Sequence, residues 1–444
     1  MNWTRFKRKY STFQIIIIGF AAIILIGTGL LMLPFSSRSG EVASLDCALF
    51  TATSAVCVTG LIVRDTASYW SGFGQAVILI LIQIGGLGVI TIAAFIETLA
   101  GKKLSVRERG LVVDSISAFH TGGMAAMTRF IIRLSLIVEA AGAVLLMPVF
   151  CRDYGLEGVW MAVFHSISAF CNAGFDLMGT HSGAFSSLTA YKGSFPVVLV
   201  ICLLIILGGI GFWTWHDIIT CRRHVRRYKM QSKVILVTTL FFIAVPAVLF
   251  FLFEFVDGPL PERISLSVFQ SVTPRTAGFN TADLSKMSGR GVGLMIALMM
   301  VGGAPGSTAG GMKITTVAVL FASAVSVFQR KKDTQLFHRR VEDSVIRRAS
   351  ALLLIYLVLV FVSACAISFM EGISMRECLF ETASAAGTAG ITLGITPSLG
   401  FFSHLILIAL MFFGRTGGLT LMYAAISDRK AEVFRRPVET INVG

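Results

Sequence analysis

The sequence predicts an all-α, polytopic membrane protein of four tandem repeats, from its composition, the placement of its basic residues and a short phrase that recurs four times. Of its 444 residues, 55% are hydrophobic and 14% are charged, and the mean hydropathy is +0.80. A soluble domain carries about a quarter charged residues. Uncharged apolar stretches that can cross roughly 30 Å of hydrocarbon recur along the chain, so we expect several membrane spans.

The net charge of +14 is explained by topology rather than by nucleic-acid binding. Of the 38 Lys and Arg residues, 27 fall in five patches, and nine lie in the four segments between them. Basic loops remain in the cytoplasm, so both termini are predicted to be cytoplasmic and no nucleic acid is expected as a partner. The patches lie at residues 5–9, 102–133, 222–233, 330–348 and 429–436.

The first apolar stretch follows a basic region, as the core of a secretory signal peptide would. It runs for about 20 residues and shows no small-x-small cleavage site. We therefore predict a retained first helix.

The repeated phrase divides the chain into four units. "ATSAVCVTGL" (52–61) is echoed by "SISAFCNAGF" (166–175), "QSVTPRTAGF" (270–279) and "TASAAGTAGI" (382–391). The aligned glycines are 114, 104 and 112 residues apart, and such a period indicates a supersecondary unit that is repeated. The predicted units cover residues 1–100, 101–221, 222–328 and 329–444.

Each unit has the same parts in the same order. A long apolar helix comes first, at 13–34, 130–150, 234–256 and 349–370. A short amphipathic stretch follows, at 45–56, 157–170, 262–273 and 375–386. The phrase comes next, and then a second long helix, at 72–99, 194–220, 288–328 and 400–427.

The short stretch is too short to cross a membrane, and the chain must return to the side from which it entered. We therefore expect a re-entrant helix, whose loop is tolerated only inside protein or along a water-filled cavity. Two full spans per unit give all units the same orientation, unlike inverted repeats. The prediction is eight transmembrane helices plus four re-entrant pore helices, around a central pore with pseudo-fourfold symmetry.

The glycine of each phrase fits a loop that lines a pore with carbonyl oxygens. Such a loop needs backbone angles of alternating hand, and glycine reaches positive φ without a steric penalty. Carbonyl rings replace the hydration shell of an ion, and the C-terminal end of each short helix favours a cation. No phrase contains Asp or Glu, which favours a monovalent ion. The alternative is that these small residues only permit close helix packing; their shared period favours the pore.

Several motifs resemble the membrane subunit of bacterial Ktr-type potassium transporters, in the Trk/Ktr/HKT superfamily. The resemblance covers essentially the whole chain, and the lack of extra N-terminal helices favours Ktr over Trk. The motifs are "VCVTGL" (56–61), "CNAGF" (171–175), "TPRTAGFN" (273–280), "GTAGITLG" (387–394), "IGGLGV" (84–89), "LGGIGF" (207–212), "GGAPGSTAGGMK" (302–313) and "GRTGGLT" (414–420).

The resemblance implies K⁺ uptake across the bacterial inner membrane through four membrane–pore-loop–membrane units. Na⁺ stays open as an activator or coupling ion, and no covalent cofactor is expected. Some plant relatives with serine at the first selectivity position tend to pass sodium, and this chain has glycine at all four. The implied selectivity-filter residues are Val58, Thr59, Gly60, Asn172, Ala173, Gly174, Thr276, Ala277, Gly278, Thr388, Ala389 and Gly390.

The last helix of the third unit is interrupted by "GGAPGSTAGG" (302–311), which has five glycines and Pro305 in ten residues. Glycine and proline destabilise helix interiors. A packing kink is the alternative, but Pro305 alone would provide one. In the resembling family, the corresponding segment is an intramembrane gate beneath the filter. The implied gate residues are Gly302, Gly303, Ala304, Pro305, Gly306, Ser307, Thr308, Ala309, Gly310 and Gly311, with Lys313 at the edge.

Arg415 stands in "FFGRTGGL" (412–419), within an otherwise apolar stretch. An ionisable residue at membrane depth is a functional candidate, so we expect Arg415 to face the ion path and to pair with loop carbonyls. The alternative is an arginine that extends to the membrane surface from a helix end. Glu139, expected to pair across repeats, and Glu254, expected near the outer surface, are assigned no site.

An enzyme is disfavoured, because the chain has no HExxH, GxSxG or GxxxxGK[ST] motif. No helix carries the periodic arginines of a voltage sensor, and no nucleotide-binding motif is present. The resemblance implies a homodimer, in contact with membrane lipid, that docks a cytosolic nucleotide-binding ring of the RCK type. Basic loops 101–129, 221–233 and 329–348 offer the surface, although orientation alone also explains them. A K⁺/Na⁺ symporter or a less selective cation pathway remains the alternative.

Overall fold

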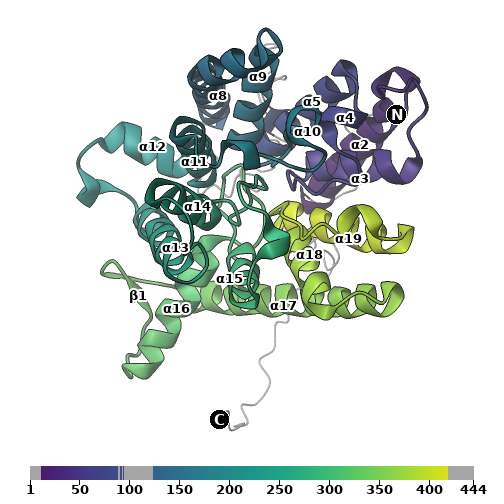
Figure 1. Cartoon of the computed structure of the whole chain (residues 1–444). Coiled ribbons are helices and arrows are strands. Elements are labelled where there is room, and N and C mark those ends of the chain that lie inside the picture. Colours follow the sequence, from purple (N-terminus) through teal and green to yellow (C-terminus); the bar gives the residue numbers. More distant parts are fainter. Residues whose placement is uncertain (1–11, 89–90, 93, 95–123, 419–444) are drawn as a thin grey trace, which may run out of the picture.

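A computed structural model describes residues 12–88, 91–92, 94 and 124–418, which form four helical groups in chain order (Figure 1). The first group contains α2 (Thr12–Leu31), α3 (Leu45–Val56), α4 (Thr66–Tyr69) and α5 (Gly72–Leu87). The second contains α8 (Met124–Tyr154), α9 (Glu157–Phe170), α10 (Gly179–Ser182), α11 (Phe195–Gly209) and α12 (Phe212–Cys221). The third contains α13 (Met230–Phe253), α14 (Leu260–Val272), α15 (Gly289–Met299) and α16 (Ile314–Phe328). A small hairpin of β1 (Gln335–Leu336) and β2 (Arg339–Arg340) leads to the fourth group, α17 (Asp343–Glu371), α18 (Met375–Gly387) and α19 (Phe401–Thr416).

Some predicted features cannot be compared with the fold. Both termini, the basic residues 102–109 and most of the loop 101–129 lie outside the described residues, as do parts of the expected helices 72–99 and 400–427.

The first helix of each group is long and apolar enough to cross a membrane. These four spans are Phe13–Leu31, Ala125–Tyr154, Met230–Phe253 and Asp343–Glu371, with mean hydropathies of 2.1 to 2.7. Helices α11 and α12 together form a fifth candidate by length and composition, bent by 96°. The composition and these helices identify a membrane protein.

The second helix of each group corrects the sequence prediction. Continuous helices over 72–99, 194–220 and 400–427 are wrong, because α5, α11 and α19 end at Leu87, Gly209 and Thr416. Just beyond these ends, three glycines take backbone angles that essentially only glycine reaches. They are Gly88, Gly211 and Gly417, with φ of 87°, 86° and 84°. In the third group, α15 and α16 flank the segment 302–311.

Close packing against the short helices explains the glycine-rich ends. A Cβ atom on Gly85 would meet the carbonyl oxygen of Val56, the last residue of α3. Gly208 stands in the same way against Phe170 of α9, and Gly414 against Ala386 of α18. These glycines therefore let the second helices of the first, second and fourth groups approach the end of the short helix in their own group.

The four short helices begin and end within two residues of the predicted stretches. An acidic residue occupies the first turn of each one, where it interacts favourably with the helix dipole. At the N-cap of α18, the Ser374 hydroxyl accepts a hydrogen bond from the Glu377 backbone N–H and donates one to its carboxylate. Local sequence therefore defines where these helices start.

The groups close a ring through contacts between neighbours (Figure 1). α5 packs on α9, α11 on α14 and α15 on α18, and α19 returns to α3. The second helix of each group thus contacts the short helix of the next.

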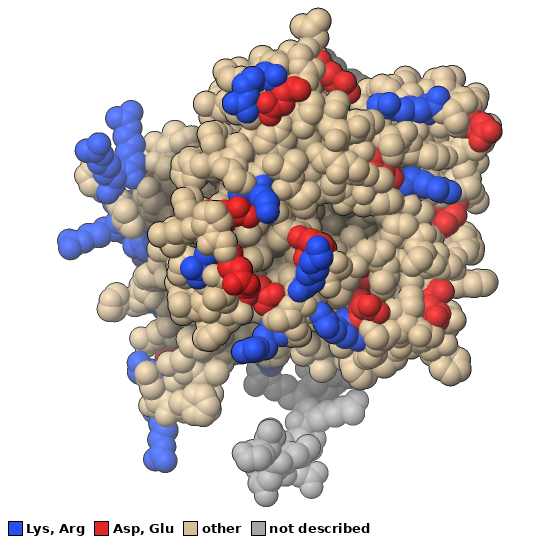
Figure 2. Space-filling model, viewed as in Figure 1, with Lys and Arg blue, Asp and Glu red and all other residues tan. Residues whose placement is uncertain are grey.

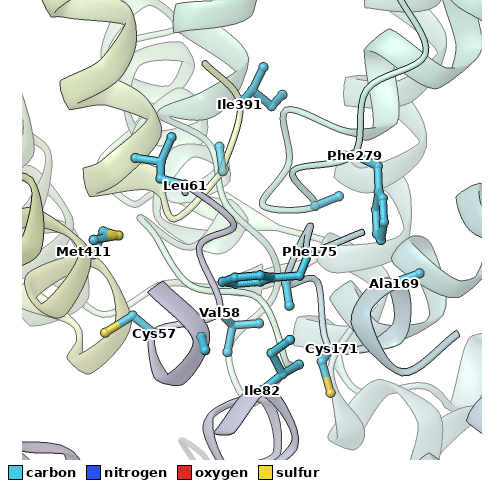
Figure 3. Packing of buried hydrophobic residues seen from close by; sticks show 14 of the residues in the cluster. Cys57, Val58, Leu61, Ile82, Ala169, Cys171, Phe175, Phe279, Ile391 and Met411 are labelled. Atoms are coloured by element: carbon cyan, nitrogen blue, oxygen red, sulfur yellow. The ribbon is translucent and has the colours of Figure 1, made fainter. Parts of the chain in front are cut away.

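Apolar side chains from all four groups meet around the phrases (Figure 3). The residue after each aligned glycine is at most 2% exposed. These residues are Leu61, Phe175, Phe279 and Ile391. Their side chains anchor each phrase in the core, which leaves the backbone to face the middle of the ring.

Candidate functional site

The four aligned glycines come together, although they are more than 100 residues apart in the chain. A Cβ atom on Gly60 would lie 2.5 Å from the carbonyl oxygen of Ala173, and one on Gly174 would lie 2.6 Å from Cα of Gly278. A Cβ on Gly278 would lie 3.2 Å from the Ala389 oxygen, and Gly390 contacts the Thr59 oxygen. We call these glycines and the two residues before each the glycine ring: Val58, Thr59, Gly60, Asn172, Ala173, Gly174, Thr276, Ala277, Gly278, Thr388, Ala389 and Gly390.

The backbone of the glycine ring alternates in hand. Besides the glycines, with φ of 94°, 70°, 83° and 76°, the residue two places earlier is left-handed in every phrase. These earlier residues are Val58, Asn172, Thr276 and Thr388, with φ of 55°, 58°, 71° and 51°. Left-handed β-branched residues are strained, and such strain clusters at functional sites. Sequence reasoning named these residues as part of the filter but did not anticipate their left-handed conformation, for which only the asparagine gave a signal.

Neutral oxygen atoms surround the glycine ring. The short helices end three to six residues before their glycines, so their partially negative ends are directed at it. Within the described chain, the hydroxyl oxygens of Thr59 and Thr388 are buried without a hydrogen-bond partner. The Asn172 amide donates to the Thr276 hydroxyl at 3.2 Å. Neutral oxygen atoms of this kind suit a hard monovalent cation.

A cavity of about 960 Å³ opens on one side of the ring and is lined by all four glycines. The face seen in Figure 2 is hollowed near its middle, with acidic and basic side chains around the hollow. Asp176, Asp283 and Lys286 are among the charged residues that line the cavity. The Ser285 hydroxyl, and after it Lys286, hold the pKa of Asp283 below its ordinary value, and Asp283 pairs with Lys286 at 3.0 Å.

The segment 302–311 lies against the ring and contacts other groups. The Thr308 hydroxyl donates to the carbonyl oxygen of Phe170 at 2.9 Å and contacts the Asn172 side chain at 3.3 Å. The backbone N–H of Gly311 donates to the Gly414 oxygen at 3.0 Å, and that of Ala304 donates to the Gly209 oxygen at 2.9 Å. None of residues 302–311 is among those that line the cavity, whereas residues that follow the four glycines do line it.

Two basic side chains bind this segment through backbone oxygens. Arg415 donates to the Thr308 oxygen and the Gly85 oxygen, and to the Gly86 oxygen at 3.0 Å. Lys313 donates to the Ala309 oxygen at 2.8 Å. Arg415 therefore joins α19, the segment and the end of α5. It lies in the last turn of α19 rather than well inside a helix, which corrects its expected position.

The two acidic residues singled out from the sequence lie beside the second phrase and at the cavity. The backbone oxygen of Glu139 accepts a hydrogen bond from the Ser166 hydroxyl at 2.6 Å, and its carboxylate contacts the Cys171 thiol at 3.8 Å. Glu139 on α8 accepts hydrogen bonds from Gln83 on α5 at 3.0 and 3.1 Å, so it contacts a neighbouring group. Glu254 binds the backbone and hydroxyl of Ser288 and lines the cavity.

The chain is similar in sequence and in fold to known cation transport proteins. The profile of the TrkH family, described as a cation transport protein, matches residues 2–433. The potassium/sodium uptake protein NtpJ of Enterococcus hirae is 37% identical, over 99% of this chain and 99% of that protein. The Ktr system potassium uptake protein B of Bacillus subtilis is also 37% identical, over 98% of this chain and 96% of that protein. The solved potassium transporter TrkH from Vibrio parahaemolyticus matches the fold with a TM-score of 0.72 at 20% identity, over 93% and 85% of the two chains.

Proposed function

Because the chain belongs to the TrkH family of cation transport proteins, we propose that it takes up potassium through the glycine ring, which acts as its selectivity filter. The family consists of membrane transporters for potassium and related cations, not of enzymes. In this proposal the four helical groups are membrane–pore-loop–membrane units, and α3, α9, α14 and α18 are the pore helices.

The convergence of four glycines from four groups carries the proposal. Each glycine packs against the backbone of a neighbouring phrase, so their carbonyl groups share one small space. The alternating hand of the backbone lets successive carbonyls line one path, and such carbonyls replace the hydration shell of an ion. The pore-helix C-termini add a favourable potential for a cation.

We further propose that residues 302–311, with Lys313 and Arg415, form a gate on the inner side of the filter. The contact of Thr308 with Asn172 supports a gate next to the filter. Arg415 presents a positive charge at a cation path, where it opposes passage. Its bonds to Thr308 and Gly86 also hold the segment in position, so their release would open the path.

The orientation follows from the basic residues. The α12–α13 linker and the β1–β2 hairpin carry exposed Lys and Arg side chains, and basic side chains project beside α12 and below α16 (Figure 2). We propose that these segments face the cytoplasm, with both termini on the same side of the bacterial inner membrane.

The same basic segments, 221–233 and 329–348, offer a surface to an RCK-type nucleotide-binding ring. This partner and a homodimer are proposals. The name of the Bacillus relative, a protein of the Ktr system, is consistent with a multi-protein assembly.

A potassium and sodium pathway on the same scaffold is the second candidate. The name of the Enterococcus relative, a potassium/sodium uptake protein, favours it. In this case Na⁺ is carried as well as K⁺, whereas in the first case Na⁺ acts at most as an activator.

The test is potassium uptake in a transport-deficient bacterium, with and without external Na⁺ and the regulatory subunit. We expect the chain to restore K⁺ uptake and growth at low external K⁺. Stoichiometric entry of ²²Na⁺ with K⁺ would favour the second candidate, and no K⁺ uptake under any of these conditions would contradict both.

A further inference from the structure

A fully buried carboxylate lies behind the fourth phrase. Glu381 on α18 is 0% exposed. Its carboxylate accepts hydrogen bonds from the hydroxyl of Thr392 and from the hydroxyl of Thr396, the latter at 2.9 Å. Thr392 stands two residues after Gly390, so Glu381 contacts the chain that follows the glycine ring. A buried carboxylate is costly unless its oxygens are satisfied, and these two hydroxyls satisfy them.

The two threonines extend this contact into the outer loop. Thr396 and Thr392 share a hydrogen bond of 3.2 Å, and the Thr392 hydroxyl accepts one from the backbone N–H of Gly394 at 2.8 Å. Gly394 is left-handed, with φ of 98°, so this hydrogen bond holds a tight turn. Glu381 therefore fixes residues 390–396 through side chains that bond the backbone.

A buried histidine holds the same loop from its other side. One ring nitrogen of His404 on α19 lies 3.0 Å from the carbonyl oxygen of Thr396, and the other lies 2.8 Å from the Asp46 carboxylate on α3. The imidazole ring therefore lies between an acceptor of the outer loop and an acceptor of the first group. Thr396 is thus tied to the first group as well as to its own pore helix.

In the other groups, the short helix holds its phrase or the chain after it through a side chain other than a carboxylate. In the second group the Asp176 carboxylate, which is not on the short helix, accepts a hydrogen bond from the Met178 N–H at 3.0 Å. His165 on α9 accepts a hydrogen bond from the Leu177 N–H at 3.3 Å, and Gln270 on α14 donates to the Asn280 side chain at 2.9 Å. In the first group, the Ser54 hydroxyl accepts from the Gly60 N–H at 3.0 Å. Among the braces from the four short helices, only Glu381 carries a carboxylate and bonds two side chains.

We propose that Glu381 is a positioning residue for the fourth filter segment and thereby contributes to the discrimination of K⁺ from Na⁺; this rests on the proposed function of the glycine ring. Gly390 packs directly on the Thr59 oxygen, so a shift of the segment after Gly390 moves a carbonyl of the first group too. Hydrogen bonds to a buried carboxyl group are stronger in a low-dielectric interior than in water. Glu381 therefore limits how far the ring can contract around the smaller ion.

The test compares K⁺ and Na⁺ uptake by purified full-length protein in lipid vesicles, for Glu381→Gln, Thr392→Val and the double variant. Loss of one such bond reduces the uptake ratio about fivefold for each single variant. The uptake ratio of the double variant is no lower than that of the more strongly affected single variant, because both changes break the same contact. Thr392→Ser keeps the hydroxyl and keeps the wild-type ratio.

Glu371→Gln is the matched control. Glu371 on α17 also binds a backbone N–H and a hydroxyl, those of Gly400 and Ser403, but it has no contact with residues 390–396 among its hydrogen bonds in the described chain. This variant keeps the wild-type ratio, which separates the loss of a carboxylate from the loss of this brace.

Unchanged ratios for folded Glu381→Gln and Thr392→Val, or effects that add in the double variant, overturn the proposal. Should Glu381→Gln fail to fold, the comparison of Thr392→Val with Thr392→Ser decides, since equal ratios for the two contradict the role of the hydroxyl. Gly60→Ser in the same assay tests the filter separately. A changed ratio for Gly60→Ser together with an unchanged ratio for Glu381→Gln rejects only the role of Glu381.

Discussion

Replacement of Gly60 by serine tests the glycine ring at its most crowded contact between the first two groups. Gly60 has φ of 94°, and a Cβ atom there would lie 2.5 Å from the Ala173 oxygen and 3.2 Å from Cα of Gly174. Real Cβ atoms essentially never come within 3.0 Å of another heavy atom. The Ala173 carbonyl must therefore move by about half an ångström or more, in a ring where such a displacement changes the fit of an ion.

The energetic cost of Gly60→Ser can be worked from the same geometry. A left-handed non-glycine residue costs of order 1–3 kcal/mol, and the displaced carbonyl weakens the binding of the preferred ion in addition. If about 1.4 kcal/mol of this appears as lost discrimination, the K⁺-to-Na⁺ uptake ratio falls about tenfold.

The assay is competition of Na⁺ with ⁸⁶Rb⁺ or K⁺ uptake in a potassium-transport-deficient cell, with protein amounts matched in the membrane. Gly183→Ser is the control, because Gly183 has a similar φ of 101° but no atom within 4 Å of its added Cβ. This control carries the backbone strain without the crowding, so it keeps the wild-type ratio. A wild-type ratio for Gly60→Ser, or equal losses for both variants, would refute the reasoning.

Three further predictions concern the gate and the cavity. Deletion of residues 306–309 removes the contacts of Thr308 with Phe170 and Asn172, so flux without the regulatory subunit rises; unchanged flux in vesicles contradicts a gate. Arg415→Gln removes a positive charge and weakens its hold on the segment, and raises the same flux roughly tenfold, whereas an unchanged or lower flux argues against a barrier. Asp176→Asn removes a carboxylate that lines the cavity and raises the KM for K⁺ a few-fold, most strongly at low ionic strength; a KM that does not change with salt or substitution excludes this attraction.

The sequence carried enough information for the local elements but less for their junctions. The short helices were predictable, because a dozen patterned residues with an acidic first turn and a glycine phrase mark them clearly. The segment 302–311 was recognisable because it combines proline with five glycines. The breaks at Gly88, Gly211 and Gly417 were missed, since the apolar pattern continues across them. The contacts with the ends of the short helices lie three residues before each break, at Gly85, Gly208 and Gly414.

The network behind the fourth phrase shows a different limit. Glu381, Thr392 and Thr396 lie within 16 residues of one another, but their bonding depends on the return of the chain around Gly390. His404 and Asp46 are 358 residues apart in the chain, and no pattern in either segment predicts their contact. Left-handed Val58 and Thr388 were likewise unpredictable, because β-branched residues disfavour this conformation and only the surrounding packing imposes it.

The central claim is that carbonyl oxygens from four loops bind one dehydrated cation, and a crystal of the protein grown in Rb⁺ tests it most directly. The account predicts anomalous scattering from Rb⁺ within the glycine ring, among the carbonyl oxygens of Thr59, Ala173, Ala277 and Ala389, and loss of this signal when Na⁺ replaces Rb⁺. An ordered ring without such a signal, with Rb⁺ bound elsewhere in the protein, would contradict it.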